Sequence, residues 1–331
     1  MKRTVWDGRW LGRHGIARHA TEVSTRLGSD VTVLPRARIS PTSPLDPAYL
    51  RRALERIGCT LFVSPGFNAA LPGRYRQLLT IHDLIHLHIK EESSRLKRLY
   101  YNQVVRPAVI RSGLVLTVSE FTRYELADWT GLDLDRIVVT GNGTSIREAS
   151  EAEIDAADAL GRDYVLAVTN GKPHKNLPLL FAAMKYLPKG IAVATVGVPE
   201  ATARQMARAA GVGATRVRCY SDVGDEELRS LYLNARCVAM PSRYEGFGLP
   251  AIEAMAVGVA TAYVCEAVEE VVGSLGERAP SGDDAEEYAR ALERAALRGR
   301  RDRTALIARS RQYSWDEVAG RVDGGIAELA K

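Results

Sequence analysis

The sequence predicts an α/β protein of two doubly wound domains with a cleft between them, and three observations lead to this prediction. The chain has 331 residues, which exceeds one ordinary hydrophobic core and suits two domains of roughly 150 residues each. Short apolar runs alternate with longer helical patterns, and such alternation implies parallel sheets with right-handed crossovers. The alternation comes in two sets, separated by a polar, alanine-rich and acidic segment at residues 145–163.

The first set of apolar runs predicts the strands of an N-terminal domain at residues 1–150. The runs are short and continuous, as expected for strands that are buried on both faces. Loop residues or a helix start follow each run, and Ser119 is a predicted N-cap of the helix after it. The predicted strands are residues 4–6, 60–64, 77–81, 114–118 and 137–140.

The second set predicts a C-terminal domain at residues 164–315, after a linker at 151–163. Residues 316–331 are expected to form a C-terminal helix, with packing on the N-terminal domain as one option. The predicted strands are residues 164–168, 191–196, 216–220, 237–240 and 259–264.

The composition indicates a soluble globular enzyme. Apolar residues make up 46% and charged residues 26% of the chain, values typical of such proteins. No apolar run reaches the roughly 18–20 residues that span a bilayer. The basic N-terminus has no apolar core behind it, so we expect no secretory signal and a cytoplasmic location.

The net charge and the cysteine positions argue against a nucleic-acid-binding protein, a disulfide-rich protein and a cysteine zinc protein. The net charge of +5 is a mild excess that permits an anionic ligand or a loose membrane contact. No recognition motif accompanies it, so nucleic acid is not an expected partner. The four cysteines form no Cys-x-x-Cys pair, which indicates neither a disulfide framework nor a cysteine zinc site.

A loop after one predicted strand carries two glutamates eight positions apart, Glu245 and Glu253. Gly246 and Gly248 let the backbone approach a ligand, and the amides there and at the following helix start form an anion-binding concavity. Pro250 suits the first turn of that helix, and Glu253 is placed in the same turn, where the dipole favours a carboxylate. One carboxylate at each end with amides between them matches the layout of a nucleotide sugar.

The residue pattern alone leaves an alternative open. The segment is equally compatible with a surface loop in which Glu253 is an ordinary acidic residue at a helix start. In the functional interpretation, the same carboxylate accepts two hydrogen bonds from a vicinal diol such as a ribose.

Residues 245–258, EGFGLPAIEAMAVG, resemble the Glu-x7-Glu signature of the retaining GT-B glycosyltransferases of family 4, the glycosyl transferases group 1. The resemblance extends from Gly15 to about Trp315 and implies a GT-B fold, two Rossmann-like domains that face a central cleft. It implies that Glu253 binds the ribose hydroxyls of the donor and that Glu245 contacts the donor sugar. It also implies that the loop amides meet the sugar and the diphosphate. Those amides belong to Gly246, Phe247, Gly248 and Leu249.

A second donor-binding segment is expected at residues 169–176, TNGKPHKN. Lys172 and Lys175 can clamp a diphosphate through charge-assisted contacts, although a solvated basic turn is the alternative. The segment is similar to a family turn whose lysine holds the donor phosphates, and Lys175 matches that lysine. Asn170 in the same turn is assigned to donor binding. His174 replaces an arginine of the family, which leaves Lys172 as the candidate for a second cation.

The segment TIHDLIHLH, residues 80–88, contains three of the six histidines. His82 follows a predicted strand, whereas His86 and His88 alternate with apolar residues, which argues against a zinc site. The segment is similar to the family sequence Thr-Ile-His-Asp-Leu, whose histidine faces the donor sugar. The resemblance gives that role to His82 and leaves His86 and His88 as structural or acceptor-side residues.

Three further segments bear on the donor site. Gly15 lies between the first strand and a helix, which suits close backbone approach to a phosphate or an acceptor; the family loop has another glycine where this sequence has His14. Residues 222–232 resemble the family segment that precedes the signature, next to the nucleobase. The nucleobase is therefore expected near Tyr220, Asp222 and Val223. After residue 264 the family has a serine and a downstream proline, whereas here Cys265 begins a shorter segment without that proline.

A basic and aromatic helix is predicted around residues 95–101, RLKRLYY, with Arg106 and Arg111 beyond it. Such a stripe is usually a solvated face of a helix that packs on a core. Contact with anionic lipid or with a phosphate-bearing acceptor is the alternative.

We therefore expect a cytoplasmic, metal-independent retaining glycosyltransferase that moves a hexose from a nucleotide diphosphate sugar to an acceptor hydroxyl. The catalytic residues are expected to be His82, Glu245 and Lys175. The sequences of these loops slightly favour a GDP-mannose-type donor. The expected acceptor is a hydroxyl of a glycan, of a lipid-linked molecule or of a secondary metabolite. Peripheral contact with the inner face of the membrane is an option. Two alternatives stay open: a nucleotide-sugar hydrolase or epimerase of the same fold, and a non-catalytic nucleotide-sugar-binding protein.

Overall fold

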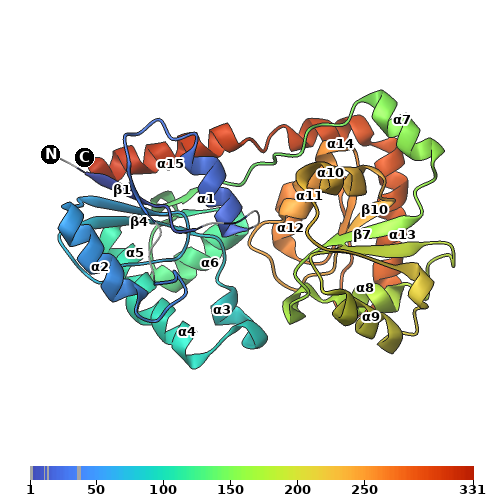
Figure 1. Cartoon of the computed structure of the whole chain (residues 1–331), viewed down its shortest axis with the longest axis horizontal. Coiled ribbons are helices and arrows are strands. Elements are labelled where there is room, and N and C mark those ends of the chain that lie inside the picture. The colour runs from blue at the N-terminus through green and yellow to red at the C-terminus, as the bar shows by residue number, and fades with distance from the viewer. Residues whose placement is uncertain (1–2, 11, 13–14, 36–38) are drawn as a thin grey trace. The chain divides into compact units, whose positions relative to one another are not determined.

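The structure, a computed structural model, describes residues 3–10, 12, 15–35 and 39–331. The chain divides into two compact units. Figure 1 colours the chain from blue at the N-terminus to red at the C-terminus. The first unit comprises residues 1–143 and 314–331, and the second comprises residues 144–313. Among the helices of the described chain, none combines the length and the apolar character that crossing a bilayer requires.

The first unit is built on a six-stranded parallel sheet in the order β2-β1-β3-β4-β5-β6. Its strands are β1 (Thr4–Asp7), β2 (Thr32–Leu34), β3 (Leu61–Ser64), β4 (Arg76–Ile81), β5 (Val115–Thr117) and β6 (Ile137–Val139). The α-helices are α1 (Ile16–Ser24), α2 (Asp46–Ile57), α3 (Ile85–His88), α4 (Arg95–Tyr100), α5 (Arg106–Ser112), α6 (Glu120–Thr130) and α15 (Trp315–Ala330). A π-helical segment, Tyr101–Val105, joins α4 to α5.

The second unit repeats this plan with a six-stranded parallel sheet in the order β12-β11-β10-β7-β8-β9. Its strands are β7 (Tyr164–Val168), β8 (Ala192–Val196), β9 (Val217–Tyr220), β10 (Cys237–Met240), β11 (Thr261–Tyr263) and β12 (Glu277–Arg278). The α-helices are α7 (Glu151–Ala159), α8 (Leu177–Ala183), α9 (Glu200–Ala209), α10 (Asp225–Leu233), α11 (Leu249–Ala256), α12 (Glu266–Val272), α13 (Ala285–Arg301) and α14 (Arg303–Ser310).

The two parallel sheets confirm the predicted α/β class and its doubly wound arrangement. The predicted N-cap is also confirmed, since the Ser119 side chain accepts the backbone N–H of Thr122 at the start of α6. The alternation of apolar runs in the sequence does not predict β2 or β12. Both are short strands at the edge of a sheet and carry exposed residues, so neither produces a buried apolar run.

The predicted linker at residues 151–163 is wrong, because most of it forms α7 within the second unit. A capping box starts this helix: Ser150 Oγ accepts the backbone N–H of Glu153, whose carboxylate accepts the Ser150 N–H. Ile154 and Ala157 are buried. The acidic, alanine-rich composition therefore belongs to a capped amphipathic helix, and the chain passes between the units at residues 143–144 and 313–314.

The C-terminal helix α15 contributes to the core of the first unit, although it is far from the rest of that unit in sequence. Trp315, Val322 and Ile326 of α15 are buried in one cluster with Trp6 and Val63 from the sheet. In Figure 1 the red α15 lies along the blue α1 and β1. The first unit is therefore complete only when both ends of the chain are folded together.

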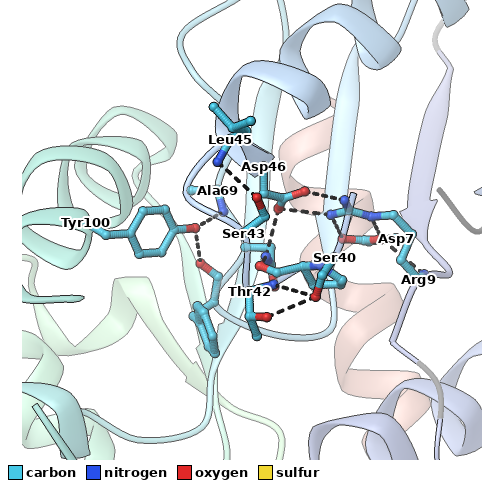
Figure 2. Close-up of polar contacts among 12 residues, drawn as sticks. Asp7, Arg9, Ser40, Thr42, Ser43, Leu45, Asp46, Ala69 and Tyr100 are labelled. Carbon is cyan, nitrogen blue, oxygen red and sulfur yellow. Dashed lines mark hydrogen bonds and ion pairs between the residues drawn. The ribbon is translucent and has the colours of Figure 1, made fainter. Parts of the chain in front are cut away.

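An arginine between two buried carboxylates follows β1 in the first unit (Figure 2). Arg9 donates to both oxygens of Asp7, from Nε at 2.7 Å and from Nη2 at 2.8 Å, and it is also bonded to Asp46 at the start of α2. Asn68 Nδ2 donates to Asp46 Oδ2 at 2.9 Å. All four residues are buried. The cluster fixes the chain after β1 to the start of α2 and to the loop after β3.

We expect Arg9→Met to destabilise the protein by about 3–5 kcal/mol, because it leaves two carboxylates buried without their cation. The free energy of unfolding in urea measures this loss. The control is Arg51→Met, which removes an exposed pair with Glu55 and should cost less than about 1 kcal/mol. Equal losses in the two variants would contradict the interpretation.

Candidate active site

The second sheet reverses its strand order between β7 and β10. From β7 the chain continues to β8 and β9 on one side, whereas β10, β11 and β12 lie on the other side. Open parallel sheets bind ligands beyond the carboxyl ends of the strands at such a reversal. The loops after β7 and β10 carry the two segments that the sequence analysis assigns to the donor, so the topology brings these segments to one place.

Lys175 and Glu245 meet there. Lys175 ends a 3-10 turn, Pro173–Lys175, after β7, and its Nζ lies 2.8 and 2.9 Å from the two carboxylate oxygens of Glu245 in the loop after β10. Only 20% of the lysine side chain and 13% of the glutamate side chain are exposed. The pair is thus partly shielded from water, which strengthens its attraction, yet it remains open to a ligand.

Two hydrogen bonds hold the lysine turn in place beside this pair. The backbone N–H of Arg243 donates to the His174 carbonyl at 2.9 Å. Asn176, which has a left-handed φ of 52°, donates from Nδ2 to the Gly282 carbonyl at 2.7 Å. His174 itself is buried, so it does not supply a second exposed cation, whereas Lys172 is exposed.

Glu253 lies inside the second unit and contacts a tyrosine. Tyr232 of α10 donates from its hydroxyl to Glu253 Oε2 at 2.6 Å, and both residues are buried. The prediction that Glu253 lies in the first turn of its helix is wrong. The helix α11 begins at Leu249 and has no acidic residue in its first turn. The Glu253 carboxylate is stabilised instead by the Tyr232 hydroxyl of the neighbouring helix α10.

Steric constraints explain the glycine at position 248 of the signature loop. Gly248 precedes α11 with a φ of 129°, and a Cβ there would lie 3.3 Å from Val268 Cγ2. Gly246 and Leu249 are half-buried. The Phe247 ring is buried and packs edge-on against Tyr313 at 5.8 Å. The Phe247 side chain therefore belongs to the core, and only its backbone is suited to donor binding.

Cys265 supports the same loop where the sequence departs from the family pattern. It lies directly before α12, is buried, and its Sγ accepts the backbone N–H of Glu245 at 3.2 Å. A thiol thus holds the backbone of Glu245 at the position where the family has a serine.

The remaining residues of the second unit that are predicted to bind the donor follow strands at the same edge of the sheet. Asn170 is exposed, and its Oδ1 accepts the Lys172 backbone N–H at 3.3 Å. Tyr220 ends β9 and is half-buried, as is Val223, whereas Asp222 is exposed with a φ of 55°. One strand, β8, separates β9 from β7, so this group is further along the edge than Lys175 and Glu245.

The candidate histidine of the first unit lies just after β4. His82 is half-buried, and its Nε2 donates to the Pro65 carbonyl at 2.8 Å. Burial lowers the pKa of His82, although the bond to Pro65 opposes this shift. A neutral ring with a proton on Nε2 keeps a lone pair on Nδ1, which can accept a hydrogen bond from a sugar hydroxyl.

His19 contacts His82 and was missed by the sequence analysis as a site residue. The two rings lie edge to face with centroids 4.8 Å apart, and His19 Nδ1 is 2.9 Å from Asn142 Oδ1. Trp315 packs on the other side of His19 at 5.9 Å. Burial, and secondarily the charge on His82, lower the pKa of His19 to about 3. His19 is thus a neutral positioning residue for His82, and no sequence signal reveals it because the contacts come from distant segments.

The other predicted residues of the first unit have different surroundings. Gly15 precedes α1 with a φ of 58° and has no heavy atom within 4 Å of the position of a Cβ. His86 hydrogen-bonds the Glu92 carbonyl at 2.8 Å, and His88 lies 3.3 Å from the Glu125 carboxylate. Within the part of the chain that the structure describes, no cluster of three or more histidine, cysteine, aspartate or glutamate side chains could hold a metal ion.

Comparison with known families identifies the chain. Residues 150–313 match the family described as Glycosyl transferases group 1, and residues 13–148 match Glycosyltransferase Family 4. The chain belongs to the GT-B glycosyltransferases of group 1. It is therefore a glycosyltransferase enzyme, and its two units are the Rossmann-like domains of the GT-B fold.

Curated relatives of this glycosyltransferase include several mannosyltransferases. It is 29% identical to O-antigen chain mannosyltransferase B of Escherichia coli, over 77% of this chain and 71% of that protein. It is 28% identical to the GDP-mannose:cellobiosyl-diphosphopolyprenol alpha-mannosyltransferase of Komagataeibacter xylinus, over 62% of this chain and 56% of that protein.

Solved structures show the same fold. The Anabaena protein HepE, in complex with UDP-glucose, aligns over 99% of this glycosyltransferase and 100% of its own chain, with a TM-score of 0.70 and 15% identity. At this identity the likeness shows the fold alone.

The contact between Tyr232 and Glu253 leads to a stability prediction. Tyr232→Phe should lower the free energy of unfolding by about 1.5–3 kcal/mol, because it removes a hydrogen bond to a carboxylate. Tyr164→Phe is the matched control, since Tyr164 is buried and donates to the Leu231 carbonyl at 2.7 Å; a bond to a neutral acceptor should cost about 0.5–1.5 kcal/mol. Equilibrium unfolding measures both, and a smaller loss for Tyr232→Phe than for the control would contradict a charged acceptor.

His19 leads to a pH prediction. Its pKa is about 3 in the folded protein and about 6.5 when unfolded, so below pH 6.5 the unfolded state binds more protons. The stability contributed by the neutral ring is complete above pH 6.5 and is lost as the pH falls. Between pH 7 and pH 5 the loss should be about 2 kcal/mol.

Unfolding in urea at pH 7 and pH 5 measures this effect. His19→Gln should reduce the difference to the part that His82 contributes, since burial also lowers the pKa of His82. The exposed His88→Gln should keep the dependence of the unchanged protein. An identical pH dependence in His19→Gln and in the unchanged protein would show that His19 does not cause it.

Proposed function

We propose that this glycosyltransferase moves a hexose from a nucleotide diphosphate sugar to an acceptor hydroxyl with retention of anomeric configuration. The observation that carries the proposal is the pair of Lys175 and Glu245 at the reversal point of the second sheet, where Nζ lies 2.8 Å from the carboxylate. A phosphate-binding cation and a sugar-binding carboxylate are thus adjacent, as the sugar and diphosphate of one donor are.

In this proposal the donor displaces the contact between the two side chains. Lys175 turns from Glu245 to the diphosphate, where the backbone amides of residues 246–249 add further donors, and Glu245 is released to accept hydrogen bonds from the sugar hydroxyls. Glu253 accepts from the ribose hydroxyls while Tyr232 orients its carboxylate. Tyr220, Asp222 and Val223 border the nucleobase.

The reaction then exchanges one bond for another at the anomeric carbon. The bond between this carbon and the phosphate oxygen breaks, and the acceptor oxygen bonds to the same carbon on the same face. The departing phosphate oxygen takes the proton of the acceptor hydroxyl. His82 is assigned to the donor sugar as the lone-pair acceptor on Nδ1, with its ring held by Pro65 and His19.

Charge stabilisation of the leaving diphosphate comes from protein groups in this mechanism. Lys175 and the loop amides act where negative charge develops, in a partly shielded site that strengthens their effect. We propose that no metal ion is required, and addition of EDTA to the assay tests this directly.

The donor is proposed to be of the GDP-mannose type. The names of curated relatives support this choice, since they include mannosyltransferases and one that uses GDP-mannose. UDP-glucose, which is bound in the structure of HepE, is the competing candidate. The acceptor is proposed to be a hydroxyl of a glycan or of a lipid-linked sugar, as in those relatives.

Thermal shift with GDP-mannose, UDP-glucose, GDP and UDP tests the donor. A ligand at a hundredfold excess over its Kd raises the free energy of unfolding by about 2.7 kcal/mol. We expect GDP-mannose to give this shift and Glu253→Ala to abolish it. A larger shift with UDP-glucose than with GDP-mannose would overturn the donor assignment.

Turnover of labelled donor tests the reaction class. A transferase consumes donor faster when an acceptor is added, a hydrolase consumes it at the same rate, and a binding protein does not consume it. NMR of the product reports the anomeric configuration. An inverted product would overturn retention while leaving glycosyl transfer intact.

The mechanism makes a specific prediction for Lys175. Lys175→Met should lower kcat/KM by about 10²–10³-fold, because it removes a group that stabilises the developing charge. Lys172→Met changes an exposed lysine of the same turn and should lower it less. Equal losses in the two variants would show that charge in the turn, rather than the position of Lys175, is what matters. A thermal melt of each variant reports folding.

A further inference from the structure

The helix formed by α4, the π-helical segment and α5 has a buried and an exposed side. Tyr101, Val105 and Val109 are buried in the core of the first unit. On the other side Leu96 and Leu99 are each 57% exposed and Ile110 is 44% exposed. Leu96 and Leu99 are one helical turn apart and so are neighbours on the helix surface. Large apolar side chains therefore lie on the side of this helix that faces away from the core.

The exposed residues of this helix are also strongly basic. Between residues 93 and 119 the chain has five cations and no acidic residue. The cations are Arg95, Lys97, Arg98, Arg106 and Arg111, and all five are exposed. We call them, together with Leu96, Leu99 and Ile110, the basic helix surface.

These five cations differ from several exposed arginines on other helices. Arg51, Arg204 and Arg290 on other helices each form an ion pair with a glutamate four positions away. In the described chain none of the five cations of the basic helix surface forms an ion pair with a carboxylate. Arg98 instead donates to Ser93 Oγ, and Arg106 donates to the Trp129 carbonyl. The positive charge of this surface is thus not neutralised locally.

We propose that the basic helix surface docks on an anionic lipid bilayer. Uncompensated cations attract anionic headgroups, and exposed leucines beside them gain free energy by entering the boundary of the acyl chains. A polyanion such as nucleic acid would account for the cations alone, since leucine side chains gain little from a phosphate backbone. A half-buried tryptophan at one end of the surface, Trp129, donates from Nε1 to Asn102, and tryptophan is favoured at membrane interfaces.

The helix that carries the basic helix surface is joined, through Tyr100, to the loop that holds His82. Tyr100, at the end of α4, accepts the Ala69 backbone N–H at 3.1 Å and donates to the Phe67 carbonyl at 3.3 Å, as Figure 2 shows in part. Pro65 of the same loop accepts from His82 at 2.8 Å. If the proposed function holds, a membrane-borne acceptor would meet the enzyme beside His82; the docking itself does not depend on that function.

Co-sedimentation of the full-length protein with vesicles tests the proposal. The vesicles are either phosphatidylglycerol mixed with phosphatidylcholine or phosphatidylcholine alone. We expect binding to the anionic vesicles, weaker binding at high salt, and little binding to phosphatidylcholine. Each cation near an anionic surface contributes about fivefold to the partition coefficient. The triple variant Arg95→Gln, Arg98→Gln, Arg111→Gln should therefore lose about 100-fold.

Matched controls separate the surface from net charge and from general hydrophobicity. The triple variant Arg51→Gln, Arg204→Gln, Arg290→Gln has the same net charge and should bind nearly as well as the unchanged protein. Leu96→Ser with Leu99→Ser should weaken binding, whereas Leu45→Ser with Leu160→Ser, which are also exposed, should not. Thermal melts report folding of every variant.

Several outcomes would overturn the proposal. These are no binding to anionic vesicles, equal binding to phosphatidylcholine, and equal losses in the basic and control triple variants. Competition by heparin together with no effect of the Leu96 and Leu99 substitutions would identify a polyanion as the partner instead. Vesicle binding needs no donor or acceptor, so its failure is distinct from a failure of the proposed transfer reaction.

Discussion

The adjacency of β7 and β10 in a parallel sheet is the constraint on which the candidate site depends. These strands are separated by two strands in sequence, yet they pair directly. Their carboxyl ends therefore deliver Lys175 and Glu245 to the same place, where the two side chains neutralise each other at 2.8 Å. Without this pairing the lysine turn and the signature loop would be two unrelated surface loops.

Three of the proposed site residues, Glu253, Glu245 and His82, are each held by a second group that is not proposed to touch the substrate. Tyr232 holds the Glu253 carboxylate, and Cys265 holds the backbone of Glu245. His19 and the Pro65 carbonyl hold the His82 ring. Such support restricts the rotamers of the working side chain before a ligand arrives, which reduces the ordering cost of the reaction. Burying these polar groups costs stability, and the hydrogen bonds of Tyr232 with Glu253 and of His82 with Pro65 offset part of that cost.

Buried polar side chains in the first unit likewise hold neighbouring segments in place. Arg9 lies between Asp7 and Asp46 and ties the chain after β1 to α2 and to the loop after β3. That loop also accepts from His82 through Pro65 and contacts Tyr100 at the end of α4. Hydrogen bonds to this one loop thus fix the relative positions of the segments at the carboxyl edge of this sheet. A purely apolar core could fill the same volume but would specify these positions less strongly.

Local patterns in the sequence were enough for the fold class, most central strands and the signature loop, because periodicity, helix capping and glycine positions act over a few residues. They were not enough for α7, whose acidic composition resembled a linker until its capping box and buried face were seen. Nor could they reveal Tyr232, His19 or Cys265 as supports, since each meets its partner across 20 or more residues of chain. The sequence by itself determined which chemical groups are present and in which loops. Only the tertiary structure decided which of them touch, because contact between distant segments is set by the pairing of strands and the packing of helices around one core.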